Sequence, residues 1–356
     1  MTRKQQILTR FPHRWDILFI EPYGLGKAQH WKSVKRENIT VITIPFMKTI
    51  PHSRLARVQS NNLVQIMFSW FITIYLQIVL FKLGFNKSSR LIGLSNVYWG
   101  KIASKLKATL HFYDANDGHL DFPNTPIWLK EYLHQYLQKS EINFSVSPEI
   151  SKKISDLGAR NIINLGNGVN FHHFNSPQNT PEELQNIEKP ILGYAGAMDW
   201  LDIDLVQKIC IAFPNYEIVL IGPEIEVGWY KKQVNFQGLK NIRYLGKVNY
   251  RDLPAYVQSF KVALIPFVVN ELTRPLNPNK LYEYSAAGKV VVSMNYSSTI
   301  QKLKDIIFVG NTHEEFLEQI EIAIETPKNE VGIHLAKQNS WDDISRKMEN
   351  SLLETI

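Results

Sequence analysis

The sequence predicts an α/β protein built from two doubly wound lobes. Its 356 residues are too many for one ordinary core and suit two domains. In both halves, short β-branched runs alternate with stretches of helical spacing, which is typical of a parallel sheet covered by helices. With 44% hydrophobic and 21% charged residues the chain can form packed cores, so a disordered or coiled-coil protein is excluded.

The first predicted domain spans residues 1–173, and its elements alternate from Trp15 onward. Its predicted strands are 15–22, 39–45, 90–95, 108–114, 142–147 and 161–168. Its predicted helices lie near 55–84, 97–106, 126–139 and 148–157. The polar segment 174–190 carries three prolines and is predicted to be a linker.

The second predicted domain, 191–338, repeats the alternation and is followed by a terminal helix at 339–356. Its predicted strands are 190–196, 216–223, 241–246, 262–267, 289–293 and 306–310. Its predicted helices lie near 202–213, 226–234, 251–260, 279–287 and 312–325. Two such Rossmann-like lobes in succession predict a cleft between the carboxyl ends of their sheets, where folds of this kind bind ligands.

The charge is concentrated in the first part of the chain. Residues 1–100 contain 14 Lys and Arg against three acids, a net charge of +11 within a total of +7. This asymmetry predicts an anionic partner, and because no nucleic-acid motif accompanies it, an anionic membrane surface is favoured over nucleic acid. The single cysteine, Cys210, excludes an internal disulfide and suits a reducing compartment. No apolar stretch precedes Trp15, so no secretory signal is expected and a cytoplasmic location follows.

The segment 61–81 is uncharged over 21 residues. Four polar residues recur along it every fourth position, as a narrow stripe on a helix: Gln65, Ser69, Thr73 and Gln77. Five basic residues flank it: Arg54, Arg57, Lys82, Lys87 and Arg90. The pattern predicts a helix packed on the first lobe with part of its apolar face available to lipid. A wholly buried core helix and a true membrane span are the alternatives.

The most specific motif is NELTRPLNPNKLYEYSAAGKVVVS at 270–293. A helix is predicted to open near Asn279, which places Lys280 and Glu283 one turn apart on the same face. The free N–H groups of a helix N-terminus, with a lysine in the first turn, suit a phosphate group. A glutamate one turn deeper can accept hydrogen bonds from the vicinal hydroxyls of a ribose. The alternative is an exposed helix pair, with Gly288 simply closing the helix.

This motif and three other segments resemble GT-B glycosyltransferases of the family 4 type, in particular bacterial exopolysaccharide and teichuronic-acid enzymes. The other segments are GYAGAMDWLDIDLV (193–206), IGP (221–223) and LGNGVNFHHF (165–174). The resemblance implies transfer of a sugar from a nucleotide sugar, often UDP-linked, that the second lobe holds. It implies that the first lobe holds the acceptor, and a lipid-linked or glycan acceptor is expected.

The resemblance also implies roles for individual residues. Glu283 is expected to hold the ribose and Lys280 the diphosphate, and Asn167 and Gly168 fall in the family's N-G-V turn near the hinge. Three further residues complete the predicted donor side: Arg274, Gly196 and Asn277.

Two positions depart from the family pattern. Many family 4 enzymes have a second glutamate eight positions before the one at 283, where this chain has Pro275. The Arg and Lys that commonly follow the first strand of the second lobe are replaced by Ala197, Met198 and Asp199. The choice between a retaining and an inverting reaction therefore stays open, and Arg274 is a substitute source of positive charge.

The second constellation is HFYDANDGHLDF at 111–122, after a first-lobe strand. An inverting transfer needs a group that takes the proton of the acceptor hydroxyl. Asp117 is the candidate base, because its place after the strand matches an acidic or histidine position of the family, with Asp114 and His119 as the other candidates. The alternative is a local cluster of capping and turn residues, which Asp, Asn and Gly favour.

Two further sequence features are weaker indications of a binding site. Gly24, in the loop after the first strand, could let backbone approach a ligand at the cleft, although a tight turn explains it equally well. Asp202 and Asp204 form an Asp-x-Asp sequence, but they fall at a predicted helix start, where aspartates are favoured by the helix dipole. No metal and no cofactor are predicted.

These observations together predict a cytoplasmic glycosyltransferase of the hexosyltransferase type, peripheral on the inner face of the membrane. Its expected role is the synthesis of envelope polysaccharide or exopolysaccharide. A GT-B epimerase and a transferase with a soluble acceptor are the alternatives among enzymes. A catalytically silent GT-B scaffold of a polysaccharide assembly complex is the alternative from another class.

Overall fold

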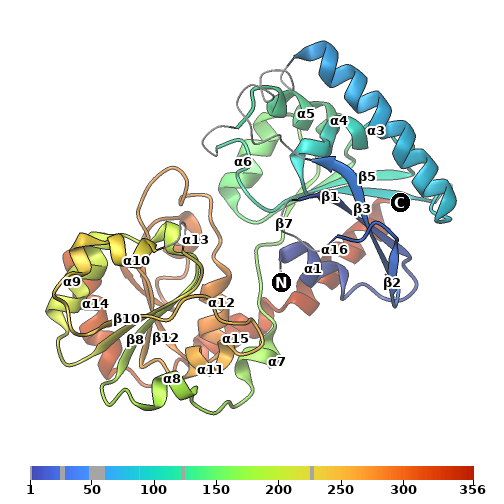
Figure 1. The fold of residues 1–356 in the computed structure, drawn as a ribbon. Helices are drawn as coiled ribbons and strands as arrows, with labels where there is room; N and C mark the ends of the chain where they lie inside the picture. Colours follow the sequence, from blue (N-terminus) through green and yellow to red (C-terminus); the bar gives the residue numbers. More distant parts are fainter. Residues whose placement is uncertain (1, 25–28, 48–60, 88, 122–124, 225–227) are drawn as a thin grey trace. The chain divides into compact units, whose positions relative to one another are not determined.

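The computed structural model describes residues 2–24, 29–47, 61–87, 89–121, 125–224 and 228–356 (Figure 1). Their contacts divide the chain into two compact units with interleaved segments. Unit 1 contains Ser147–Glu149 and Gly166–Ile344. Unit 2 contains Thr2–Val146, Ile150–Leu165 and Ser345–Ile356.

Unit 1 is built on a parallel sheet of six strands in the order β10-β9-β8-β11-β12-β13. The strands are β8 (Ile191–Ala195), β9 (Glu217–Ile221), β10 (Ile242–Tyr244), β11 (Val262–Ile265), β12 (Val290–Met294) and β13 (Phe308–Gly310). Every residue of the four strands β8, β9, β11 and β12 is buried, as expected of a parallel sheet covered on both faces. The strand order reverses between β8 and β11, so their carboxyl ends form the switch point where such sheets bind ligands.

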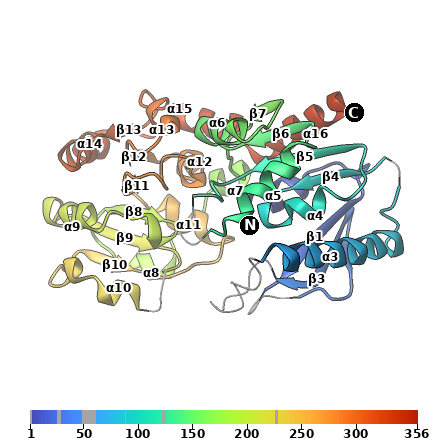
Figure 2. The same ribbon diagram turned by 90° about the horizontal axis from the view of Figure 1, so that it is seen from above.

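Helices cover both faces of this sheet (Figure 2). On one face lie α9 (Ile203–Ala212) and α14 (His313–Glu325), and on the other lie α11 (Leu253–Gln258) and α12 (Asn279–Ala286). α12 also contacts α7 (Phe171–Asn175) and α15 (Glu330–Gln338). The remaining short helices are α8 (Glu182–Gln185), α10 (Trp229–Lys232) and α13 (Ser298–Gln301).

The segment 174–190, predicted to be a linker, belongs to unit 1. Phe174 and Leu184 are 0% and 2% exposed and join the core of that unit. Because these two side chains are anchored there, the polar residues between them follow the surface of the unit. The chain instead changes unit at the short segment Ser147–Glu149, near Leu165 and near Ile344. The last of these crossings lies within the terminal helix α16 (Trp341–Thr355), most of which belongs to unit 2.

Unit 2 contains two sheets where the sequence predicted a single parallel one. The parallel strands β4 (Leu91–Leu94), β5 (Leu110–Ala115), β6 (Ile142–Ser145) and β7 (Ile162–Asn164) form one sheet in chain order. In the other, β3 (Ile39–Met47) pairs in parallel with β1 (Ile17–Tyr23) and antiparallel with β2 (Val34–Arg36). The sequence analysis missed β2, because its three exposed residues carry no apolar alternation.

The helices of unit 2 include two that the sequence analysis did not predict in this form. α1 (Arg3–Leu8) is too short to show a periodic pattern, and a 3-10 turn at Val97–Trp99 precedes the short α4 (Gly100–Ala103). The others are α3 (Asn62–Lys82), α5 (Trp128–Leu137) and α6 (Pro148–Asp156). Within the described part of the chain, α3 is the helix with the length and apolar composition to cross a bilayer, and 39% of its apolar window is buried.

Candidate functional site

The switch point of unit 1 brings the start of α12 against the end of β8. Gly196 directly follows β8, and Lys280 is the second residue of α12. A Cβ atom at Gly196 would lie 2.0 Å from Cε and 2.6 Å from Nζ of Lys280. The lysine side chain therefore lies directly against the backbone at this strand end, and a side chain at position 196 would displace it.

Two aromatic rings surround the Lys280 ammonium group. Its Nζ atom lies 5.6 Å from the ring centre of Tyr194, in β8, and 5.1 Å from that of Phe267, which follows β11. Both rings are buried, and aromatic faces attract cations. Burial lowers the pKa of Lys280, and the charge of Glu283 opposes this shift. The cation is thus held where the two central strands end.

Glu283 lies one helical turn after Lys280 and is partly exposed. Burial raises the pKa of Glu283, and the Lys280 charge opposes the rise. No residue that the structure describes donates a hydrogen bond to this carboxylate, so its oxygens can accept hydrogen bonds from a ligand. Gly288, at φ 71°, does terminate α12, but the two ionisable residues are not the freely exposed pair of the alternative interpretation.

Tyr284 fixes α12 to the end of β8. Its fully buried hydroxyl accepts a hydrogen bond from the Ala195 amide at 2.7 Å and lies 3.2 Å from the carbonyl oxygen of Ala195. Burial raises the pKa of Tyr284, so the hydroxyl keeps its proton. The sequence analysis did not assign a role to this residue, although the motif contains it.

The loop before α12 is held by the segment that follows β7. Asn167 Nδ2 donates a hydrogen bond to the carbonyl oxygen of Asn277 at 2.6 Å. At Gly168 a Cβ atom would lie 2.4 Å from the carbonyl oxygen of Asn339, so this close approach requires glycine. Of the two predicted hinge residues, Asn167 therefore contacts the predicted donor-side loop, whereas Gly168 lies against Asn339. Asn277 itself is 8% exposed.

The backbones of the turns after β8 and β9 lie against each other. Gly222 has φ 144°, and a Cβ atom there would lie 1.8 Å from the carbonyl oxygen of Gly196. Asn279, the first residue of α12, has its Oδ1 buried without a hydrogen-bond partner among the described residues. From the sequence, Asn279 was predicted only as the start of this helix.

Arg274 does not join this cluster through any contact of the described residues. It forms an ion pair with Glu271 at 2.8 Å, and both side chains are largely exposed. The neighbouring Pro275 carbonyl accepts a hydrogen bond from Ser147 Oγ at 2.8 Å. The predicted role of Arg274 as a substitute source of positive charge therefore stays a prediction, since the ion pair that it forms is with Glu271.

Among the candidate bases of unit 2, Asp114 already forms an ion pair with Arg3. Arg3 Nε lies 3.1 Å from each of its carboxylate oxygens, and both side chains are buried. A guanidinium that lies this close to both carboxylate oxygens occupies their lone pairs. Asp114 is therefore poorly suited to take a proton from a substrate, and it serves instead to fix α1 onto the end of β5.

Asp117 is the better candidate base. Its Oδ1 atom accepts a hydrogen bond from the Gly118 amide at 2.9 Å. Burial raises the pKa of Asp117, and the nearby charge of Asp121 raises it further. A higher pKa makes the carboxylate a stronger base. His119 lies beside it, with Nε2 3.3 Å from Asn116 Oδ1.

The weaker sequence signals have local roles. Asp202 Oδ1 caps α9 by accepting from the Leu205 amide at 3.0 Å, and its Oδ2 lies 2.9 Å from His313 Nε2. Asp204 accepts a hydrogen bond from Asn235. Gly24 follows β1, and its carbonyl accepts from Gln29 Nε2 at 2.8 Å, whereas the rest of its glycine loop lies outside the described residues.

The two α/β units define the class of this protein: it has the GT-B fold of glycosyltransferases, as the resemblance predicted. Residues 189–326 match the family of glycosyl transferases group 1, and this range contains the whole sheet of unit 1. Over 214 residues the chain is 25% identical to TuaH of Bacillus subtilis (strain 168), named for teichuronic acid biosynthesis. That similarity covers 56% of this chain and 52% of TuaH, about half of its length.

Solved structures share the whole fold at low sequence identity. Sucrose-phosphate synthase from Thermosynechococcus elongatus has a TM-score of 0.71 at 11% identity, over 96% of this chain and 89% of its own. The E. coli trehalose-6-phosphate structure bound with UDP-2-fluoro glucose has a TM-score of 0.70 at 11% identity, over 98% and 94%. HepE of Anabaena with UDP and glucose has a TM-score of 0.65 at 14% identity, over 89% and 86%.

Proposed function

We propose that the protein transfers a hexose from a UDP-sugar to a lipid-linked or glycan acceptor in envelope polysaccharide or exopolysaccharide biosynthesis. The observation that carries this proposal is the Lys280 and Glu283 pair at the switch point of unit 1. Three similarities support it: the match to glycosyl transferases group 1, the partial similarity to TuaH, and the UDP-containing ligands of the structural neighbours.

In this proposal the start of α12 binds the diphosphate of the donor. The positive end of the α12 dipole and the Lys280 ammonium both attract the negative charge of the diphosphate. The Gly196 and Gly222 backbone lets the phosphates approach without a side chain in the way. Glu283 accepts hydrogen bonds from the ribose hydroxyls, and Asn279 Oδ1 is a further acceptor for a sugar hydroxyl.

The same lysine would stabilise the leaving nucleotide. Negative charge builds up on the diphosphate as the glycosidic bond breaks, and a preorganised cation lowers the energy of that transition state. The buried rings of Tyr194 and Phe267 keep water away from the ammonium group, which strengthens its interaction with phosphate. Removing one such group typically slows turnover by about 10² to 10³.

On the acceptor side, Asp117 would act as the base of an inverting transfer. Its burial-raised pKa brings it closer to the operating pH, where a general base is most effective. A retaining transfer would need no base at the acceptor. Replacement of Asp117 therefore also reports on the stereochemical course.

The proposal is tested by a thermal-shift screen of UDP-sugars followed by an assay of UDP release with lipid-linked acceptors. A ligand that binds the native state raises the melting temperature. We expect stabilisation by UDP and by its cognate UDP-sugar in the wild type, and loss of that stabilisation in Lys280→Met. Ile322→Gln, an exposed change in α14, is the matched control.

The alternatives give different results in the same assays. No stabilisation by any nucleotide sugar, with an intact fold, would support the catalytically silent scaffold. Conversion of the donor sugar without an acceptor would support an epimerase. Product formation with soluble glycans alone would contradict the lipid-linked acceptor while leaving sugar transfer in place.

A further inference from the structure

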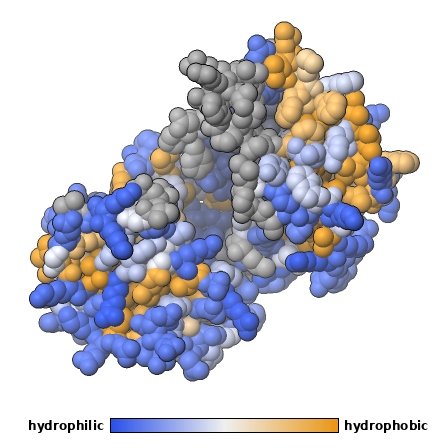
Figure 3. Space-filling model, viewed as in Figure 1, coloured by the Kyte–Doolittle hydropathy of each residue, from blue (hydrophilic) through white to orange (hydrophobic). Residues whose placement is uncertain are grey.

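Three of the four stripe residues of α3 lie on its buried side, whereas the fourth, Gln77, is exposed together with large apolar side chains. Gln65, Ser69 and Thr73 are 5%, 1% and 8% exposed. Large apolar side chains project outward instead, and the most exposed are Leu63, Met67, Trp70, Phe71, Ile78 and Phe81. Hydrophobic residues accordingly gather on the surface over α3 in Figure 3. A surface helix in contact with water shows the opposite arrangement.

The buried polar stripe is bonded within unit 2. Tyr132 Oη contacts Gln65 Oε1, Lys105 Nζ donates to Ser69 Oγ at 2.9 Å, and Thr73 Oγ1 donates to the Ser69 carbonyl at 2.6 Å. These polar side chains therefore need no contact with water or with another molecule.

Apolar side chains complete the attachment of α3 to unit 2. Ile72, Leu76 and Leu80 pack in a cluster that includes Ile44 and Ile102. A helix fixed along one whole side in this way is neither wholly buried nor free to be surrounded by lipid as a span. It presents a largely apolar outer face, with Gln77 as an exposed polar residue near its C-terminal end.

Positive charge accompanies this face. Residues 61–110 contain six Lys and Arg and no Asp or Glu. Lys82, in the last turn of α3, is exposed, and so are Lys87 and Lys107. The basic residues predicted before the helix, Arg54 and Arg57, lie outside the described residues.

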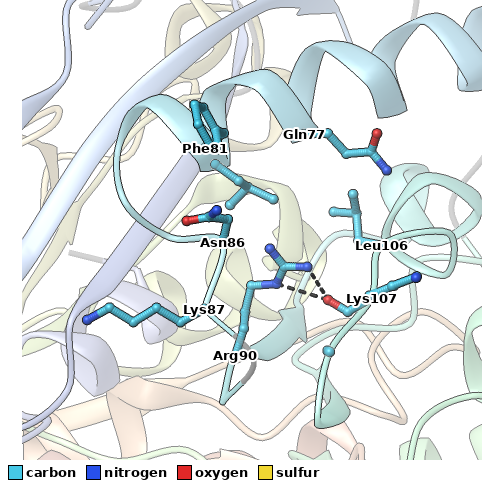
Figure 4. A pocket seen from close by; sticks show the side chains of 9 residues that line it. Gln77, Phe81, Asn86, Lys87, Arg90, Leu106 and Lys107 are labelled. Carbon is cyan, nitrogen blue, oxygen red and sulfur yellow. Dashed lines mark hydrogen bonds between the residues drawn. The ribbon is translucent and has the colours of Figure 1, made fainter.

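A cavity of about 500 Å³ lies at the C-terminal end of α3. Leu80, Phe81 and Leu106 contribute apolar walls, and Lys87, Arg90 and Lys107 contribute cations (Figure 4). The Arg90 guanidinium donates to the backbone carbonyls of Lys107 and Phe85, which fixes its charge between the two lysines. No acidic side chain lines the cavity.

We propose that α3 is a bilayer-docking helix that lies in the interface of an anionic membrane. Its outward face enters the acyl-chain boundary, Lys82 stays in the headgroup layer, and the cavity at its end receives the phosphate headgroup of an anionic lipid. An aromatic and aliphatic face bordered by lysines is characteristic of interfacial helices. Three residues of the polar stripe are bonded inward, and the fourth, Gln77, is exposed at the cavity end of the helix, so the outer face is apolar except at Gln77. This docking is independent of sugar transfer, since it requires no donor.

The test is flotation of the purified protein with phosphatidylcholine vesicles that contain or lack phosphatidylglycerol. We expect strong binding only with phosphatidylglycerol. Lys87→Glu with Lys107→Glu should weaken that binding at least about ten-fold, because each cation near the surface contributes to lipid attraction. Trp70→Gln with Phe71→Gln should weaken it to a similar extent by removing apolar contact.

Matched controls separate these effects from general changes in charge or hydrophobicity. Lys302→Glu with Lys304→Glu reverses two exposed charges of unit 1, and Ile211→Gln with Ile322→Gln removes two exposed apolar side chains there. Both controls should bind vesicles as the wild type does. Circular dichroism and melting temperature establish that each variant is folded.

Brominated lipids report the depth of Trp70. Shallow bromines should quench its fluorescence most, and Trp70→Phe should remove that part of the quenching. Strongest quenching by deep bromines would show a span and overturn the proposal. The proposal would also be overturned if Trp70→Gln with Phe71→Gln bound vesicles like the wild type.

Self-association through α3 without any vesicle binding would assign the apolar face of α3 to a second copy of the chain. Failure of the UDP assays alone would leave this docking intact.

Discussion

The Tyr284 hydroxyl accepts a hydrogen bond from the Ala195 amide at 2.7 Å, and this contact joins α12 to the last residue of β8. Gly196 and Lys280, which lie beside it, depend on this junction for their mutual position. The buried Tyr284 hydroxyl thus helps to fix the distance between the Gly196 backbone and the Lys280 ammonium group.

Tyr284→Phe should therefore weaken both stability and donor binding. The Ala195 amide would remain buried without its partner, which costs about 1 to 3 kcal/mol. Urea unfolding measures the loss of stability, and calorimetric titration with UDP measures the loss of affinity. Tyr216→Phe, a partly exposed tyrosine of unit 1, is the control and should change neither quantity by much. Unchanged UDP affinity in Tyr284→Phe would contradict the positioning role.

Gly196→Ala should reduce donor affinity through Lys280. The new methyl group would meet Cε of the lysine at 2.0 Å, so the side chain must leave its place between the rings. In a Lys280→Ala background the same change should have a much smaller effect, because the atoms that clash are gone. A double-mutant cycle of UDP affinity measures this coupling. Additive effects would show that the glycine acts independently of the lysine.

UDP affinity should fall on both sides of a pH optimum. Burial lowers the pKa of Lys280, so the ammonium group loses its proton, and its attraction for phosphate, at a lower pH than an ordinary lysine does. Burial raises the pKa of Glu283, so this carboxylate becomes protonated at a higher pH than an ordinary glutamate. Titrations of UDP across pH measure both limbs. At the high UDP concentrations needed for the weaker binding of Lys280→Met, the residual affinity should no longer fall at alkaline pH, and that of Glu283→Gln should no longer fall at acidic pH. Persistence of either limb would assign it to another group.

Asp117→Asn should remove turnover while UDP affinity stays unchanged. The amide keeps the shape of the side chain but cannot accept the proton of the acceptor hydroxyl. UDP release in the presence of acceptor measures the first effect and calorimetry the second. An active Asp117→Asn protein would eliminate this residue as the base and would favour the retaining course.

Asp114→Asn should destabilise unit 2. It would leave the buried Arg3 guanidinium without its counter-charge, and breaking a buried ion pair in this way costs about 3 to 5 kcal/mol. Denaturant unfolding followed by circular dichroism measures the loss. Lys152→Gln, which breaks the exposed pair with Asp156, is the control and should cost less than about 1 kcal/mol. A catalytic role of Asp114 would appear instead as lost turnover at full stability.

The sequence predicted unit 1 more fully than unit 2, for a physical reason. The strands β8, β9, β11 and β12 are buried on both faces, so each is a mostly apolar run that differs clearly from the sequence around it. The exposed β2 carries no such pattern, and its pairing with β3 depends on the tertiary fold.

The same contrast between local sequence patterns and contacts made by the tertiary fold holds for the candidate site. Lys280 and Glu283 were predictable because a helix places residues one turn apart on one face. The clash that excludes a side chain at Gly196 could not be predicted, because Gly196 and Lys280 are 84 positions apart in the chain. Likewise, the ion pair that engages Asp114 comes from Arg3, in a helix too short to be recognised from its sequence.

The carboxylate of Glu349, in α16, accepts hydrogen bonds from Arg14 and Trp15, near the opposite end of the chain. Because α16 is synthesised after nearly all of unit 1, these two hydrogen bonds form only once translation has reached α16. We therefore expect unit 2 to gain its full stability later than an N-terminal domain that folds as soon as it leaves the ribosome.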